Sequence, residues 1–424
     1  GHAAPAHRPL IRPVALSIDE ARRVVLGTVT PLAGEDVPLE RAAQRFLAED
    51  VVAAGDVPPF TNSAMDGFAV HPAPAGTVLR VTGESRAGAP SPVALGPGQA
   101  IAVATGAVVP EGATAVVPIE RVEVGEGEVR LAADIAEGAN IRKPGEDVRT
   151  GQTVLRRGAR LGAAEVGVAA GAGRATVRCT RMPAVAIVVT GDELRAPGSA
   201  LGPGQIHESN GLTLAALAAA TGAVVHRTDP VPDRRDATHE ALRAALEHAD
   251  VVLASGGVSV GPHDHVKAAL GDLGVRERFW RVALRPGKPT WFGTREEAAG
   301  GAAGDGGGAA AGCTRLVFGL PGNPVSAMVT FLLFARPALL ALQGADPTAR
   351  RVLATLTEPI AALPDRAQAV RVRLEETATG RTATPTGPQG SHQLRSMVGA
   401  QGLAIMPAAE EEFPAGAGVT VELV

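Results

Sequence analysis

The sequence has no tyrosine and only two cysteines, two tryptophans and three lysines among 424 residues. Cys179 and Cys313 lie far apart and lack C-x-x-C spacing, which excludes a disulfide framework and a cysteine-based zinc site. The longest apolar stretch, from Met328, contains Arg336 and Pro337 and is shorter than the roughly 20 residues that a membrane helix needs. The first residues contain no apolar signal-peptide region, and the formal net charge of -4 shows no bias toward nucleic acid. We therefore expect a cytoplasmic protein without nucleic-acid or membrane partners.

Lysine and asparagine are rare, with three Lys against 37 Arg and four Asn in the whole chain. This bias is typical of GC-rich coding, so the Lys and Asn residues that remain indicate where function is to be sought. All seven lie in or beside polar, glycine-bearing stretches. They are Asn62, Asn140, Asn210, Asn323, Lys143, Lys267 and Lys288.

The length predicts two to four domains. Ser17 followed by Glu20 forms a capping-box pattern that starts one short helix, and "PLERAAQRFLAED" (38–50) predicts a second. Residues 55–140 contain short apolar runs broken by Gly and Pro, which indicate an inserted β-domain. The flanking segments 15–54 and 141–180 are expected to form one discontinuous, elongated mixed domain.

Residues 181–345 change to continuous apolar runs that alternate with helical segments. This pattern predicts a doubly wound α/β domain with a parallel sheet covered on both faces. Residues 294–315 are rich in Gly and Ala and are expected to be a disordered excursion between two of its strands. Residues 346–424 contain short alternating runs that predict a C-terminal β-domain.

Polar turns follow the apolar strands of the α/β region, and the carboxyl ends of parallel strands are where ligands bind. The turn "SGGVSVG" offers glycines for close backbone approach and hydroxyls for an anion. It lacks the residue order of a P-loop or a dinucleotide fold, and a tight turn with capping serines would explain the same residues. The candidate residues of this turn are Ser255, Gly256, Gly257, Ser259 and Gly261.

Carboxylates in the same region suggest a metal site. "TGDEL" ends another strand with Asp192 and Glu193, one of which could instead cap a helix. Glu193 with Asp264 would form a hard-oxygen pair suited to Mg²⁺, provided that the two strands are neighbours. His263 and His265 flank Asp264, but without a third ligand of suitable spacing we expect them to be exposed to solvent.

Basic residues cluster in "FWRVALRPGKPTWFG", which contains Arg281, Arg285 and Lys288. Residues four apart in a strand point the same way, so the two arginines could form an oxyanion clamp or an ordinary solvated strand face. "GLPGNPVSA" predicts a rigid helix start that exposes backbone N–H groups to an anion. Its candidate residues are Pro321, Gly322, Asn323, Pro324 and Ser326. Arg371 and Ser391, in the last domain, carry little signal by themselves.

The sequence has no recognisable Ser-His-Asp set, catalytic cysteine or nucleotide loop. Abundant carboxylates and anion-binding turns favour a transfer reaction on a phosphorylated or oxyanionic ligand, assisted by a divalent cation.

Eight motifs, in order, resemble the MoeA family, the molybdopterin molybdenumtransferases related to the gephyrin E domain. They are "NSAMDGFAV", "VATGAVVPEGATAVVPIE", "NIRKPGEDVRTGQTVL", "VAIVVTGDEL", "SGGVSVGPHDHVK", "LRPGKPTWFG", "GLPGNPVSA" and "GPQGSHQLRSM". The resemblance extends over nearly the whole chain from about Leu16. It implies a four-domain subunit whose C-terminal domain is barrel-like.

The resemblance further implies insertion of molybdenum from molybdate into adenylylated molybdopterin, with release of AMP and help from Mg²⁺. The SGGVSVG turn, Arg281, Arg285 and Lys288 would hold the phosphorylated ligand or molybdate, and Glu193 with Asp264 would hold the metal. Pro321 and Pro324 would shape the pocket, with Arg371 and Ser391 lining it. The implied catalytic residues are Asp66, Thr105, Glu193, Asp233 and Asp264.

By the same resemblance the protein is a homodimer in which Asp66 and Thr105 act on the partner subunit's ligand. Arg281 and Arg285 stand where lysine is common in the family, which keeps the charge but replaces a point donor with a planar fork. A molybdopterin adenylyltransferase and a non-enzymatic molybdopterin-binding scaffold are the alternative functions, and a separate adenylyltransferase is a possible partner. The resemblance leaves open whether Asp66 acts as a base, binds the metal or orients molybdate.

Overall fold

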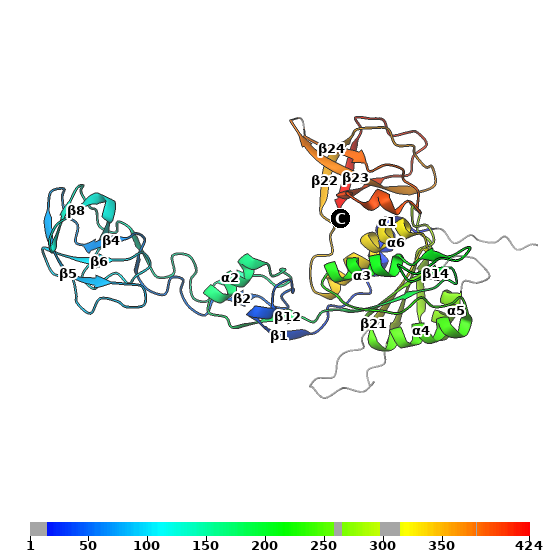
Figure 1. Cartoon of the computed structure of the whole chain (residues 1–424), viewed down its shortest axis with the longest axis horizontal. Coiled ribbons are helices and arrows are strands. Elements are labelled where there is room, and N and C mark those ends of the chain that lie inside the picture. The colour runs from blue at the N-terminus through cyan, green and yellow to red at the C-terminus, as the bar shows by residue number, and fades with distance from the viewer. Residues whose placement is uncertain (1–14, 258–264, 297–313, 379) are drawn as a thin grey trace, which may run out of the picture. The chain divides into compact units, whose positions relative to one another are not determined.

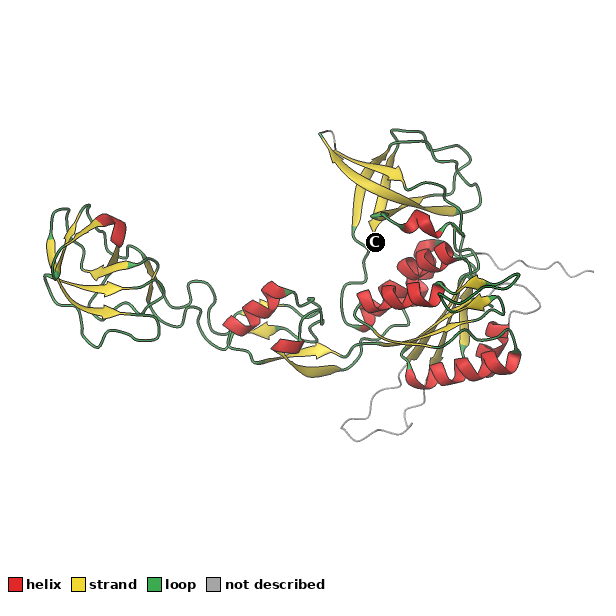
Figure 2. Ribbon diagram, viewed as in Figure 1, coloured by secondary structure: helices red, strands yellow, loops and turns green. Residues whose placement is uncertain are grey.

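The computed structural model describes residues 15–257, 265–296, 314–378 and 380–424. The chain divides into two compact units, one formed by Gly1–Gly34 with Thr180–Val424 and the other by Glu35–Cys179. The first unit combines helices with strands, whereas the second consists mainly of strands (Figure 1, Figure 2). Each unit has hydrophobic cores of its own.

A mixed six-stranded sheet forms the centre of the first unit. Its strand order is β16 (Val224–Arg227), β13 (Ala184–Val189), β17 (Val251–Ser255), β21 (Thr314–Leu320), β20 (Trp291–Glu296) and β18 (Arg276–Trp280). The first four strands are parallel, and β20 and β18 continue the sheet in antiparallel pairing. The prediction of a parallel sheet is therefore confirmed, with two antiparallel strands at one edge. Because β13 and β17 are neighbours, the turns that follow them lie at the same edge.

Helices cover both faces of this sheet, as the continuous apolar runs predict. In β13, Val185, Ile187 and Val189 face one core while Ala186 and Val188 face the other, because successive side chains alternate along a strand. The helices that contribute to the first core are α1 (Ile18–Leu26), α3 (Asn210–Ala220), α6 (Pro324–Thr330) and α7 (Arg336–Leu342). Those that contribute to the second are α4 (Arg235–His248) and α5 (His265–Asp272).

One continuous helical segment, Pro324–Leu342, runs through α6, a π-helical stretch at Phe331–Ala335 and α7. Pro337 does not end it, although a proline has no N–H for the carbonyl four residues earlier. That carbonyl belongs to Leu333, and it accepts a hydrogen bond of 3.0 Å from Nε of Arg22 in α1. The proline is therefore tolerated because another helix supplies the missing donor.

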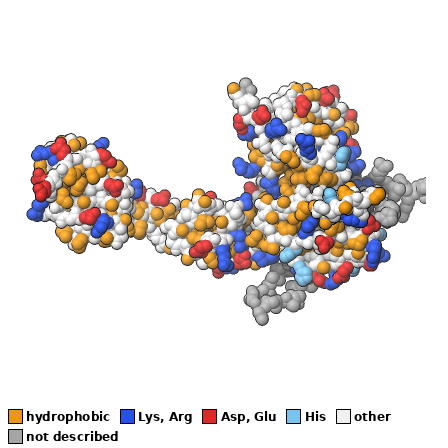
Figure 3. Space-filling model, viewed as in Figure 1, with side chains coloured by type: hydrophobic (Ala, Val, Ile, Leu, Met, Phe, Trp, Pro, Cys, Tyr) orange, Lys and Arg blue, Asp and Glu red, His pale blue; other side chains and the backbone are white. Residues whose placement is uncertain are grey.

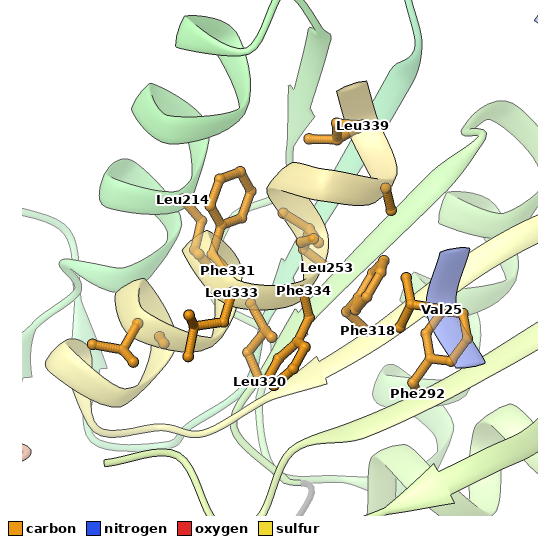
Figure 4. Packing of buried hydrophobic residues seen from close by; sticks show 14 of the residues in the cluster. Val25, Leu214, Leu253, Phe292, Phe318, Leu320, Phe331, Leu333, Phe334 and Leu339 are labelled. Atoms are coloured by element: carbon orange, nitrogen blue, oxygen red, sulfur yellow. The ribbon is translucent and has the colours of Figure 1, made fainter. Parts of the chain in front are cut away.

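The same segment is long and apolar enough to cross a membrane by length and composition, and 72% of its most apolar window is buried. Figure 4 shows Phe331, Leu333 and Phe334 packed with side chains of the sheet and of α3. The described part of the chain contains no other helix that passes this test. Packing in the core thus accounts for its apolar character.

Helix α1 begins with the predicted capping box. Ser17 Oγ accepts from the backbone N of Glu20, and the Glu20 carboxylate accepts from the backbone N of Ser17 at 2.8 Å. The helix packs through Ile18, Ala21 and Val25 into the core of the first unit. This differs from the predicted boundary, which assigned residues 15–54 to the elongated domain. The other predicted domain boundaries stay predictions.

A closed five-stranded barrel forms the C-terminal part of the first unit. Its strands are β22 (Arg351–Leu356), β23 (Ala367–Thr377), β24 (Gly380–Pro385), β25 (Gly402–Met406) and β26 (Gly418–Leu423). The sheet closes because β25 pairs with both β26 and β23. The barrel-like C-terminal domain is confirmed. The short strand β19 (Leu284–Arg285) pairs with the start of β23 and so joins the region after β18 to the barrel.

The second unit contains a six-stranded sheet and a smaller mixed region. The strand order of the sheet is β7 (Ala115–Pro118), β4 (Gly67–Val70), β6 (Gln99–Val103), β5 (Val78–Ser85), β9 (Glu128–Leu131) and β8 (Val122–Val124). In the mixed region, distant segments pair with each other. The pairs are β1 (Gly34–Pro38) with β12 (Thr176–Thr180), β2 (Val51–Val52) with β11 (Thr153–Leu155), and β3 (Asn62–Ser63) with β10 (Ile141–Arg142). Helix α2 (Ala163–Gly171) packs beside them.

The prediction of a second helix over residues 38–50 is wrong. Only the short 3₁₀ turn Leu39–Arg41 forms there, and Gln44 adopts a left-handed conformation with φ 68°. Phe46 and Leu47 instead form bridges to Arg160 and Cys179. Pairing with a distant segment outweighs local helix propensity, which is a weak preference in a packed protein.

On the face shown in Figure 3, basic and acidic side chains are interspersed over both units. This agrees with the small net charge and places any anion-binding region in a local cluster rather than in a broad basic surface.

Candidate active site

A first cavity of about 250 Å³ lies where β13, β17 and β21 end. Among the described residues it is lined by Asn210, which the sequence marked only as a rare asparagine, and by Glu208, which gave no signal. The lining residues that the sequence predicted as site residues are Glu193, Asp233, Ser255, Gly256, Gly257, Gly322 and Pro324. Ligands of open α/β sheets bind at this edge, where the backbone exposes donors. The structure therefore brings together three predicted motifs, although Glu193 in the first and Pro324 in the last are 131 positions apart in the sequence.

The glycines of the SGG turn are required by the backbone. Gly256 and Gly257 have φ of 93° and 62°, and a Cβ on Gly256 would lie 2.7 Å from the carbonyl oxygen of Thr190. The Ser255 hydroxyl already makes two hydrogen bonds within the protein. It accepts from Asn210 Nδ2 at 2.9 Å and donates to the carbonyl of Pro321 at 3.3 Å. Ser255 thus helps to build the wall of the cavity. Ser259, Gly261 and Asp264 lie outside the described residues.

The first cavity is rich in carboxylates. Glu208 is buried and is neutralised by Arg227 at 3.0 Å, while Glu193 and Asp233 are the more accessible acids. A hydrogen bond joins Asp192 and Asp233: the Asp233 backbone N–H donates to Asp192 Oδ1 at 3.0 Å. No helix follows Asp192, so neither acid of the TGDEL motif caps one; the strand β14 (Leu194–Arg195) follows instead. Hard oxygen donors at a cavity wall suit Mg²⁺, which needs only one or two carboxylates when substrate phosphates complete its shell.

A second cavity of about 340 Å³ lies between the segment after β18, the start of α6 and a loop of the barrel. It brings together the predicted Arg285, Lys288, Asn323, Ser326 and Ser391. A glycine is needed here too: Gly287 has φ 121°, and a Cβ would lie 2.5 Å from Thr330 Cγ2. The described residues that line this cavity include no carboxylate, so its character is cationic.

Sequence reasoning missed several residues of the second cavity. Arg366, Gln389, Gly390 and His392 also line it. Arg366 forms a bidentate pair with Asp365, which lowers the pKa of the Asp365 carboxyl. Arginine is common in this chain, so Arg366 gave no signal, whereas His392 directly follows Ser391 in a motif that the sequence had singled out.

Arg281 does not line either cavity. Strand β18 ends at Trp280, and Arg281 then adopts a left-handed conformation with φ 80°, so Arg281 and Arg285 do not share a strand face. The Arg281 guanidinium lies over the Trp280 ring at 4.1 Å from its centroid, and Lys267 Nζ also lies over that ring, at 3.4 Å. The predicted two-arginine clamp is therefore wrong in its geometry, because the chain turns between the two residues.

Arg371 is completely buried and lies behind the second cavity rather than in its lining. Its guanidinium donates to Ser396 Oγ and to the carbonyls of Pro388, Gln389 and Gly390. In the described part of the chain no carboxylate pairs with it. Burial, and after it the nearby charge of Arg285, lowers the pKa of Arg371 to about 10. Its contacts are those of a residue that shapes the loop containing Ser391.

The second unit contains the predicted pair Asp66 and Thr105. Asp66 Oδ1 accepts from the Thr105 backbone N–H at 2.7 Å and from its hydroxyl at 3.0 Å. These two bonds, the backbone one first, hold the pKa of Asp66 below its ordinary value. The next residue must be glycine, because a Cβ on Gly67 would lie 2.0 Å from the carbonyl oxygen of Val117. Asp66 is therefore an exposed, ionised carboxylate on a fixed backbone.

Comparison with known proteins identifies the class to which this fold and these cavities belong. Residues 16–173 match the family description "MoeA N-terminal region (domain I and II)", residues 186–341 match "Probable molybdopterin binding domain", and residues 353–424 match "MoeA C-terminal region (domain IV)". The first cavity lies wholly within the second of these regions.

Individual relatives extend the match to nearly the full length. The chain is 36% identical to molybdopterin molybdenumtransferase 2 of Mycobacterium tuberculosis over 96% of its own length and 98% of the relative's. It is 32% identical to the molybdopterin molybdenumtransferase of Bacillus subtilis, with 96% and 94% covered. A solved molybdopterin biosynthesis MoeA protein from Pyrococcus horikosii superposes with a TM-score of 0.78 at 30% identity, over 96% of this chain and 99% of that one. The chain belongs to the MoeA family.

Proposed function

We infer that this chain is a molybdopterin molybdenumtransferase, which inserts molybdenum from molybdate into adenylylated molybdopterin and releases AMP. The observation that carries this inference is the pair of cavities at one edge of the first unit. The first lies in the molybdopterin-binding region, and the second is lined by Arg285 and Lys288. One cavity suits a phosphorylated pterin with a cation, and the other suits a tetrahedral oxyanion.

We assign molybdate to the second cavity. Arg285 offers a planar fork of donors and Lys288 a point charge, while Ser391 and Asn323 add neutral polar groups at its wall. An oxyanion with two negative charges is held best where such donors converge, and Asp365, which pairs with Arg366, is the nearby carboxylate that would compete with it. This separates the ligands more finely than the sequence did.

Mg²⁺ belongs to the first cavity in this proposal. Glu193 would hold it with Asp264, and Asp233 is the further carboxylate that the cavity offers. The ion would neutralise charge on the phosphate groups and on the leaving AMP. The protein's own contribution is to fix the ligand through the backbone of Gly256 and Gly257 and to keep the carboxylates at the strand ends.

We further propose a cytoplasmic homodimer whose active site is shared, with Asp66 and Thr105 acting on the ligand held by the partner subunit. Asp66 stands on an open surface, beside the exposed side chains of Met65 and Ile119, so it needs a second surface to complete a site. A symmetric dimer supplies two such sites by one contact.

Purified protein should release AMP from adenylylated molybdopterin only when molybdate and Mg²⁺ are both present. Release without molybdate would contradict molybdenum insertion, and consumption of ATP with free molybdopterin would indicate an adenylyltransferase instead. Binding of molybdopterin without any release would indicate a scaffold. Asp66→Asn should keep the fold but abolish insertion.

Mixing two inactive variants tests the shared site. Subunits with Asp66→Asn and subunits with Arg285→Met should, after exchange, recover about a quarter of wild-type activity, because half of the dimers contain one intact site. Absence of any recovery, with subunit exchange verified, would show that Asp66 acts within its own subunit.

A further inference from the structure

The turn at Gly322, Asn323 and Pro324 forms part of both cavities. Gly322 and Pro324 line the first cavity, and Asn323 lines the second. The turn follows β21 and leads directly into α6, whose first residue is Pro324. Any shift of this turn would therefore change the shape of the two cavities together.

On the side of the first cavity, the turn is held by Asn210. Its Nδ2 group donates to the Gly322 carbonyl at 2.7 Å and to Ser255 Oγ at 2.9 Å. Asn210 is the first residue of α3 and is only 9% exposed. One buried amide thus links the end of β17, the turn after β21 and the start of α3. In a buried setting such bonds are costly to lose, because the acceptors are left without water.

On the side of the second cavity, the turn is held by the barrel loop. Asn323 Nδ2 donates to Ser391 Oγ at 3.1 Å, and the Val325 N–H donates to the Ser391 carbonyl at 3.1 Å. The hydrogen bonds therefore run without a gap from Ser255 through Asn210 and the turn to Ser391. This chain of contacts connects the walls of the two cavities.

We propose that Asn210 is a positioning residue for both ligands: its amide fixes the Gly322–Pro324 turn and so holds the pterin cavity and the oxyanion cavity in register. The inference rests on the proposed function. The inference also goes beyond the proposed function. Asn210 lines only the first cavity, yet by holding the turn it would affect the binding of molybdate in the second. Loss of the amide frees the Gly322 carbonyl, and the turn that carries Asn323 is then held from one side only.

Two substitutions separate the contacts of Asn210. Asn210→Ala removes both hydrogen bonds. Asn210→Asp keeps the shape but has no N–H to donate. It can still bond Ser255 by accepting from its hydroxyl, which reverses that hydrogen bond, but it turns a carboxylate oxygen toward the Gly322 carbonyl. If the turn is what matters, both variants weaken ligand binding, whereas a role through Ser255 alone would leave Asn210→Asp close to wild type.

Gln343 provides a matched control. Its buried amide Nε2 donates to the carbonyls of Thr221 and Leu339 at 2.8 and 2.9 Å, and it lines neither cavity. Gln343→Ala loses two comparable bonds and should lower the melting temperature in the same way. It should leave both dissociation constants unchanged, which separates a loss of stability from a loss of positioning.

The experiment measures, by calorimetry well below the melting temperature, the dissociation constants of molybdate and of metal-free molybdopterin. Asn210→Ala and Asn210→Asp should each weaken both ligands about 10-fold. Ser391→Ala should weaken molybdate alone. The proposal is overturned if the Asn210 variants weaken only molybdopterin, or neither ligand, while the wild type binds both. Failure of the wild type to bind either ligand would instead refute the proposed function.

Discussion

The two cavities of the first unit are neighbours that share one turn but differ in charge. Glu193, Glu208 and Asp233 line the first, whereas Arg285, Lys288 and Arg366 line the second. A phosphorylated ligand and molybdate are both anions, so a single basic pocket would bind either without discrimination. Under the proposed function, this difference would let the phosphorylated ligand bind together with a cation and let molybdate bind without one.

The largest effect is expected when the basic cavity loses its main donor. Arg285→Met should weaken molybdate binding about 100-fold, as expected for lost hydrogen bonds between charged groups. Molybdopterin binding should change far less. Arg285→Lys should recover much of the lost molybdate binding, because lysine restores the positive charge. It should not recover all of it, because lysine lacks the planar pair of donors of a guanidinium. Calorimetric titration with each ligand checks this, and equal losses for both ligands would break the distinction between the cavities.

The next effect concerns the wall behind the basic cavity. Arg371→Met should weaken molybdate about 10-fold, because the carbonyls of Pro388, Gln389 and Gly390 lose their donor and the Ser391 loop relaxes. Arg373→Met, at an exposed position two residues along the same strand, is the control and should have little effect. In a Ser391→Ala background the effect of Arg371→Met should largely disappear. Additive losses would show that Arg371 acts independently of that loop.

The acidic cavity should respond to magnesium instead. Glu193→Gln and Asp233→Asn should each raise the Mg²⁺ concentration for half-maximal AMP release several-fold, since one oxygen donor of full charge is lost. The dissociation constant of molybdate should stay at its wild-type value. A parallel rise in both quantities would show that the two cavities are not separate sites.

The smallest effect is expected in the second unit, from a substitution at Thr105 that only shifts the pKa of Asp66. Thr105→Val removes the hydroxyl bond but keeps the backbone bond, so the pKa of Asp66 should rise part of the way toward its ordinary value. Because the folded protein holds this pKa low, the ionised form persists as pH falls and is lost only on passing the lowered pKa. In the Thr105→Val variant, Asp66 should become protonated at a higher pH than in the wild type. The acid limb of the activity profile should move to higher pH with it. A carboxyl titration by NMR measures the shift, and an unchanged pKa would contradict the role given to the hydroxyl.

Much of the fold followed from local pattern. The apolar runs of β13, β17 and β21 predicted buried parallel strands, and Ser17 with Glu20 predicted the start of α1. The predictions that failed concerned segments whose structure depends on residues far away in the sequence. Residues 38–50 have helix propensity, but Leu47 pairs with Cys179 instead. Pro337 interrupts the apolar stretch in the sequence, yet the helical segment continues through it, because Arg22, more than 300 residues earlier, bonds the Leu333 carbonyl.

The candidate site shows the same limit. Turns after parallel strands predicted that Glu193, Ser255 and Gly322 would meet, because strand ends share an edge. The burial of Arg371 and the stacking of Arg281 on Trp280 could not be predicted, because a single arginine has the same signal whether it is a ligand or a scaffold. Asn210 stood out only as one of four asparagines, since its two acceptors lie 45 and 112 residues away.

The division of ligands between the two cavities is tested most directly by locating molybdenum. Crystals of the wild-type protein grown with molybdate should show an anomalous scattering peak in the cavity lined by Arg285, Lys288 and Ser391. A peak among Glu193, Asn210 and Ser255 instead, or full occupancy of both cavities by molybdate, would contradict the assignment.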